Sequence, residues 1–186
     1  MENFNLKVAG ALIFIGATQF ILCMIIAEAL HPNYSVKENY ISDLGVGQAA
    51  PIFNASVITL GITVLAGAYL IQRVKHYKIF TTLLVLCGAG TAGVGLFPEN
   101  FGIIHTAASL FAFLFGALSA IAAYKIQKPP ISYFSIILGV SSLAALILFG
   151  LNIHLGLGKG GMERMIAYPI LLWAIGFGGH LVAYKS

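Results

Sequence analysis

The side chains in this chain that could do chemistry are few, and most of them fall at the ends of long apolar runs. Only 9% of the residues are charged. Three histidines, His31, His105 and His154, share these positions with acids such as Asp43 and Glu99. Histidine and carboxylate side chains serve as general acids and bases and as metal ligands. Since ionisable groups beside apolar runs are costly, their concentration marks a candidate site.

We predict that these groups form one polar pocket centred on His105. Its expected ligand-binding residues share one predicted membrane face: His105, Asp43, Glu99, Glu163, Arg164, Asn39 and Tyr40.

Two interpretations of this pocket involve a cofactor. In the first, His105, one of His31 and His154, and a carboxylate hold zinc with an open water position, as in a membrane hydrolase for lipid-like bonds. No His-Glu-x-x-His spacing supports it. In the second, two of the three histidines ligate a b-type haem, as in an electron-transfer protein or a respiratory-complex subunit.

The third interpretation needs no cofactor, and we favour it. The polar groups then form a hydrogen-bonded cap that seals a helix bundle or binds a lipid headgroup or a partner subunit, with Arg164 paired to a carboxylate. Within the cap, Asp43 is expected in a tight turn, where its carboxylate accepts backbone N–H groups and Gly45 supplies a positive φ.

The elements that must position these residues are membrane-spanning helices. The mean hydropathy is +0.94 and 59% of the residues are apolar, which is too much for a water-soluble surface. A span needs about 20 mostly apolar residues. Such runs occupy residues 8–30, 52–71, 79–97, 101–124, 134–151 and 165–184. We therefore predict an all-α bundle of six transmembrane helices in a single integral membrane domain, residues 1–186.

The basic residues predict the orientation of the bundle, because Lys and Arg collect in short cytoplasmic loops. Lys37, Lys159 and Arg164 lie on one side of the predicted spans. The other side carries Lys7, Arg73, Lys75, Lys78, Lys125, Lys128 and Lys185. Both termini are therefore expected in the cytoplasm of a cell-membrane protein, with the polar pocket on the extracytoplasmic side. The net charge of +4 reflects this topology, and we expect no nucleic-acid partner.

Small residues predict close helix contacts. Gly88 with Ala92, and Ala89 with Gly93, have the four-residue spacing that lets a neighbouring backbone approach. The stretch 156–161 matches G-x-G-x-x-G but follows an apolar helix, so we interpret it as a flexible outer loop and not a dinucleotide site.

Three short motifs resemble a known family. His31-Pro32 leads to Asn39-Tyr40-Ile41-Ser42-Asp43-Leu44-Gly45; Phe97-Pro98-Glu99 is followed by His105; and Gly161-Met162-Glu163-Arg164 leads to Leu172-Trp173. With these motifs the chain resembles the archaeal and bacterial six-span membrane proteins of domain of unknown function number nine hundred and ninety-eight. The resemblance implies six spans and no established activity. Together with the pocket it points to a membrane lipid as the partner, with a complex subunit or a homo-oligomer as further possibilities.

Overall fold

Six long helices make up most of the chain. A computed structural model describes residues 2–183, so the last predicted span residue, 184, and Lys185 lie outside the described part. The helices are α1 (Glu2–Leu30), α2 (Ala50–Lys75), α3 (Lys78–Leu96), α4 (Ile103–Ala122), α5 (Ile131–Gly150) and α6 (Gly158–Val182). All six are long and apolar enough to cross a membrane, and no strand occurs within residues 2–183. The predicted all-helical, six-span fold is confirmed.

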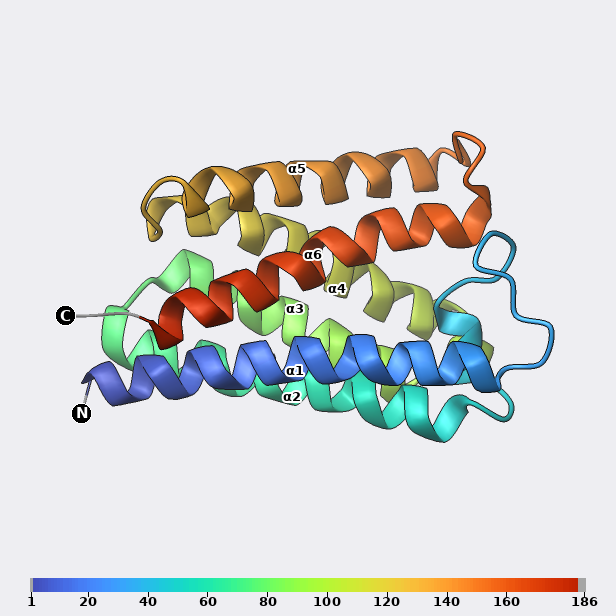
Figure 1. The fold of residues 1–186 in the computed structure, drawn as a ribbon, viewed down its shortest axis with the longest axis horizontal. Helices are drawn as coiled ribbons and strands as arrows, with labels where there is room; N and C mark the ends of the chain where they lie inside the picture. The colour runs from blue at the N-terminus through green and yellow to red at the C-terminus, as the bar shows by residue number, and fades with distance from the viewer. Residues whose placement is uncertain (1, 184–186) are drawn as a thin grey trace.

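The helices form a ring. Each helix packs against its neighbours in the chain, and α6 returns to pack along α1, which closes the ring. The first residues of α1 and the last residues of α6 lie at the same end of the bundle (Figure 1). Contact between α4 and α6 is sparse, and α5 packs against both of them. The space inside the ring is therefore bordered by α1, α2, α3, α4 and α6.

Small residues allow close helix contacts, and the predicted pair Gly88 and Ala92 lies at one of them, whereas Ala89 of the other predicted pair is exposed. On α3, a Cβ atom at Gly90 would lie 2.5 Å from the backbone nitrogen of Ala112 on α4. On α2, a Cβ atom at Gly61 would lie 2.7 Å from the Gly88 carbonyl oxygen of α3. Without a hydrophobic driving force between helices in lipid, such backbone approach and its dispersion contacts hold the ring together.

Side-chain hydrogen bonds add to the contacts between helices. Gln19 of α1 donates to the Ser56 carbonyl of α2 over 2.8 Å. Ser142 of α5 donates to the Ile166 carbonyl of α6, also over 2.8 Å. In membranes such bonds average about 0.6 kcal/mol each.

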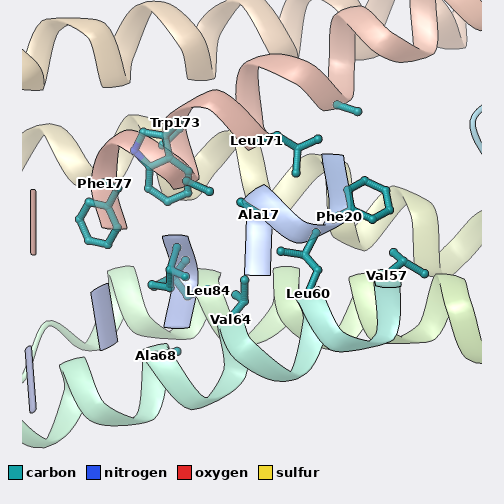
Figure 2. Close-up of a cluster of buried hydrophobic side chains, with 14 of the residues drawn as sticks. Ala17, Phe20, Val57, Leu60, Val64, Ala68, Leu84, Leu171, Trp173 and Phe177 are labelled. Carbon is teal, nitrogen blue, oxygen red and sulfur yellow. The ribbon is translucent and has the colours of Figure 1, made fainter. Parts of the chain in front are cut away.

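The interior of the ring is apolar. Leu171 and Trp173 of α6 face Leu60 and Val64 of α2 across it (Figure 2). Trp173 is 4% exposed, although it belongs to a protein whose outer face is almost entirely apolar. Burial here reflects packing between helices, while the outward-facing apolar residues suit a lipid environment.

The segment that joins α1 to α2, residues 31–49, covers the end of the bundle opposite the termini (Figure 1). We call it the cap. It contains the short helix η1 (Ser42–Gly45), which contacts η2 (Glu99–Phe101) in the α3–α4 connection. The α5–α6 connection lies at the same end.

The start of α6 differs from the prediction. The helix begins at Gly158 and not near residue 165, so the predicted flexible loop at 156–161 is largely the first turn of α6. A Cβ atom at Gly160 would lie 2.6 Å from the Val36 carbonyl oxygen and would overlap the Asn39 carbonyl. The Gly160 N–H also donates to the Lys37 carbonyl over 3.0 Å. Glycine is needed there because the cap backbone lies directly against the helix, so the apolar pattern alone underestimated its length.

Candidate functional site

Arg164 fastens the cap to the bundle. Its guanidinium is 4% exposed and donates to the Glu28 carboxylate and to the Tyr34 hydroxyl, each over 2.6 Å. The other terminal nitrogen donates to carbonyl oxygens of Val36 and Gly160 over 3.2 and 2.9 Å, and to that of Asn39. The fork of an arginine suits such a set of acceptors because its donors are planar and fixed. The pairing of Arg164 with a carboxylate, expected from the sequence, is confirmed.

Tyr34 connects Arg164 to another part of the cap. Its hydroxyl accepts from Arg164 and donates to the Tyr40 carbonyl over 2.8 Å. Burial raises the pKa of Tyr34 to about 12, against the lowering effect of Arg164. The phenol therefore remains a hydrogen-bond donor at any physiological pH.

Glu163 points to a different part of the cap from its neighbour Arg164. The Glu163 side chain is 6% exposed, and its carboxylate accepts a hydrogen bond of 2.5 Å from the Ile41 N–H. Successive residues of an α-helix are about 100° apart around the axis, since 3.6 residues make one turn. One residue thus faces the α1 side and the other faces the interior of the ring.

Asp43 and Glu99 form a pair of carboxyl groups between η1 and η2. Asp43 accepts hydrogen bonds from the Asn39 side chain over 2.9 Å and from the Tyr40 N–H over 3.0 Å. Although burial raises it, hydrogen bonds from Glu99, Asn39 and Tyr40 hold the pKa of Asp43 below its usual range. Burial, and then Asp43, raise the pKa of Glu99 to about 7. Near neutral pH, Glu99 therefore shares its proton with the Asp43 carboxylate, and this bond ties η1 to η2.

The expected turn at Asp43 is confirmed in one respect and wrong in another. The carboxylate does accept a backbone N–H, that of Tyr40. Gly45, however, is not among the residues with positive φ, and the cap glycine that adopts a left-handed conformation is Gly47, at φ 80°. Gly45 is buried instead, and its carbonyl accepts from Asn54 of α2 over 3.0 Å, so packing and not turn geometry requires a small residue there.

A cavity of about 100 Å³ lies inside the helix ring beneath the cap. Its walls are mostly apolar side chains of α1, α2, α3, α4 and α6, including Leu60, Leu171 and Trp173 (Figure 2). At the end next to the cap it is lined by Ser42 and Glu163. Because 10 residues of helix separate Glu163 from Trp173, the cavity extends roughly 15 Å along α6.

Comparison of the sequence with known proteins identifies the family of this chain. The sequence model of the family described as "Protein of unknown function (DUF998)" matches residues 14–180, which is nearly the whole chain. The chain belongs to the DUF998 family. No curated protein and no solved structure matches it. The predicted family membership is thus confirmed, and the family description carries no activity.

In this DUF998 member His105 is buried inside the bundle, as predicted, and both of its ring nitrogens have partners. Nδ1 lies 2.8 Å from the Phe97 carbonyl oxygen and Nε2 lies 3.2 Å from the Ser109 hydroxyl. Nδ1 must therefore be the protonated nitrogen that donates to Phe97, and the Ser109 hydroxyl donates to Nε2. Phe97 follows the last residue of α3, where backbone carbonyls lack helical partners, so His105 completes the end of that helix.

The structure does not gather the three histidines. His31 packs against the Tyr34 ring and His154 against the Phe149 ring, while His105 bonds to Phe97 and Ser109. Among residues 2–183, no three His, Cys, Asp or Glu side chains are placed to hold a metal ion. The geometry thus lends no support to the zinc or the haem interpretation.

The acidic part of the predicted pocket is gathered. Asp43 and Glu99 share a hydrogen bond, and both interact electrostatically with Glu163. Asn39 and Tyr40 hold Asp43, while Arg164 serves Glu28 and the cap backbone.

Sequence reasoning missed two kinds of residue. The partners of Arg164, Glu28 and Tyr34, were not assigned to the site, although an acid at the end of a span beside a buried arginine was a usable signal. Nothing in the sequence marks Ser42 and Trp173 as residues that line a cavity, because a cavity depends on how several helices pack.

Proposed function

We propose that this DUF998 member binds a single-chain amphiphile, with the apolar chain in the central cavity and the polar group beneath the cap. One observation carries the proposal: a mostly apolar cavity inside the ring ends at the buried carboxyl group of Glu163. Apolar pockets with a few convergent polar groups are the usual form of small-molecule sites.

The size of the cavity limits the ligand to at most one chain, which must displace part of the wall. Its volume of about 100 Å³ is less than that of an engineered cavity of about 150 Å³ that admits benzene. A slender hydrocarbon chain can enter by displacing flexible walls such as Leu60 and Leu171, whereas the two chains of a diacyl lipid would require the helices to separate. The walls offer no cluster of polar groups that would suit a large water-soluble ligand.

The charge pattern supports an extracytoplasmic site in the cell membrane. Basic residues are concentrated at the end of the bundle that carries the termini, including Arg73, Lys78 and Lys125. By the positive-inside rule this end is cytoplasmic. The cap and the acidic residues then lie at the outer leaflet, where the polar group of a membrane amphiphile resides.

Trp173 provides a direct test because it is the only tryptophan in the chain and lines the cavity. We expect 12-bromododecanol, added to the protein in lipid nanodiscs, to quench Trp173 fluorescence saturably. Ala167→Phe fills the cavity at a lining position and should weaken this binding at least tenfold. The matched control is Ala89→Phe, at an exposed position on α3, which should bind like the natural protein.

Quenching by general partitioning into the bilayer must be separated from binding. The double variant W173F/L172W moves the tryptophan by one residue to a position that is 57% exposed on the outer face of α6. Its quenching should rise linearly with the bromoalkanol in the bilayer. Linear quenching of Trp173 as well, unchanged in Ala167→Phe, would refute the proposed function.

A further inference from the structure

The carboxyl group at the end of the cavity has an unused acceptor. One Glu163 oxygen accepts from the Ile41 N–H, and no residue within 2–183 donates to the other. The side chain is 6% exposed and lines the cavity. A carboxyl oxygen that has no donor at the end of a mostly apolar cavity marks a position where a ligand can supply one.

Groups of both signs act on the charge of Glu163: Arg164 favours a negative charge there, and two carboxyl groups oppose it. Asp43 and Glu99 both interact unfavourably with a negative charge on Glu163. Arg164 is the nearest cation, but its terminal nitrogens are directed to Glu28, Tyr34 and cap carbonyls. An anionic group at this position would thus meet carboxylates, because Arg164, whose Nε–H has no partner, is not among the residues that line the cavity.

The remaining cation near the site is Lys159, which sits on the outside of the acidic group. Its ammonium lies 4.5 Å from the centre of the Tyr40 ring and interacts with Asp43 and Glu99. Lys159 is not among the residues that line the cavity. It balances part of the charge of Asp43 and Glu99, and within residues 2–183 no Lys or Arg lines the cavity beside Glu163.

We infer that the amphiphile carries a protonated primary amine, whose N–H groups donate to Glu163 and to the Ser42 hydroxyl at the end of the cavity. This inference rests on the proposed function and names the headgroup of its ligand. An ammonium has three donors and no acceptor, which complements a site that offers acceptors. Charge-assisted hydrogen bonds are roughly twice as strong as neutral ones, so the amine should bind more tightly than an alcohol of equal chain length.

The chemistry of the site also argues against phosphate-bearing lipids. Phosphate binding in proteins relies on free Arg or Lys side chains or on backbone N–H groups. At the cavity end of this site the available backbone donor, that of Ile41, is already used by Glu163. A single-chain amine is compatible with the narrow cavity and with the carboxyl group at its end.

The test compares three chains of equal length that end in bromine: 12-bromododecylamine, 12-bromododecanol and 12-bromododecanoate. Dissociation constants come from saturable quenching of Trp173 in nanodiscs of uncharged, unbrominated lipid at pH 7. We expect the amine to bind at least tenfold more tightly than the alcohol, and the carboxylate to bind most weakly. In Glu163→Gln the affinity for the amine should fall to that for the alcohol, while the dissociation constant of the alcohol should change less than threefold.

The outcomes separate the two proposals. Saturable quenching by all three chains with equal constants, or tightest binding by the carboxylate, would overturn the amine inference and leave the proposed function standing. Saturable quenching by none of them would overturn both.

A second variant covers the case in which Glu163→Gln does not fold. Glu99→Gln removes a neighbouring carboxyl without touching the Glu163 hydrogen bond to Ile41. This variant should weaken binding of the amine two- to threefold and leave binding of the alcohol unchanged. Equal effects on the two ligands would contradict the inference.

Discussion

Replacing Arg164 by methionine should release the cap from the bundle. The guanidinium is 4% exposed and serves five acceptors: the Glu28 carboxylate, the Tyr34 hydroxyl and the carbonyls of Val36, Asn39 and Gly160. Removing one partner of a buried ion pair costs about 3–5 kcal/mol because the other charge is left unpaired. The Glu28 side chain keeps 20% exposure and some contact with water, so we expect a loss of about 3 kcal/mol in unfolding free energy.

A double-mutant cycle assigns this loss to the ion pair. Glu28→Gln, Arg164→Met and the combination are compared, and the two losses should fail to add by about 1–3 kcal/mol, since the groups are in contact. Arg164→Lys keeps the charge but not the fork, so it should recover only part of the loss. The matched control is Arg73→Met, an exposed arginine of α2, which should change stability by less than about 0.5 kcal/mol.

The assay is unfolding by sodium dodecyl sulfate in mixed micelles, followed by far-ultraviolet circular dichroism. The reasoning is refuted if Arg164→Met stays within about 0.5 kcal/mol of the natural protein, or if its effect adds fully to that of Glu28→Gln. Either result would mean that the cap is held by other contacts.

Three further predictions concern groups around the cap. Glu99 has an ordinary pKa of 4.5 that rises to about 7 in the folded chain, so the folded state holds a proton that the unfolded chain releases. Stability should therefore fall as the pH rises from about 5 to about 7.5, and Glu99→Gln should reduce this slope in unfolding titrations. Gly160→Ala should cost about 1–3 kcal/mol by forcing the cap away from α6, whereas Gly176→Ala, with open space around its Cβ, should be neutral or slightly stabilising when melting temperatures are compared. His105→Ala removes the donor of the Phe97 carbonyl and should lower the unfolding free energy by about 0.5–1.5 kcal/mol, without changing the zinc content or the visible spectrum of the purified protein.

The spans could be predicted from the sequence because lipid imposes a strong and simple rule on composition. Long apolar runs such as that of α5 have no alternative in a membrane, since backbone groups there must bond within the segment. The inward position of His105 could also be predicted, because small and polar residues recur at helical spacing on one side of α4. The role of His105 could not be predicted, because its partner is a carbonyl at the end of another helix.

The start of α6 shows where hydrophobicity stops being informative. Residues 158–164 are glycine or charged, with the exception of Met162, so they resemble a loop, yet they are helical because they lie against the cap. Once they are helical, Glu163 and Arg164 must face different surroundings. From the sequence alone the two neighbours looked like members of one pocket, whereas they serve the cavity and the cap anchor separately.

The return of α6 to α1 has a consequence for biogenesis. Helices enter the bilayer one after another and assemble there afterwards. Until α6 has been inserted, Glu28 lacks its ion-pair partner Arg164, and the Ile41 N–H lacks its acceptor Glu163. The ring is then open to lipid between α1 and α5. A nascent chain that has released only five helices is thus an unsealed intermediate, and a truncated product should be a substrate for membrane proteases. Maturation therefore depends on the insertion of α6.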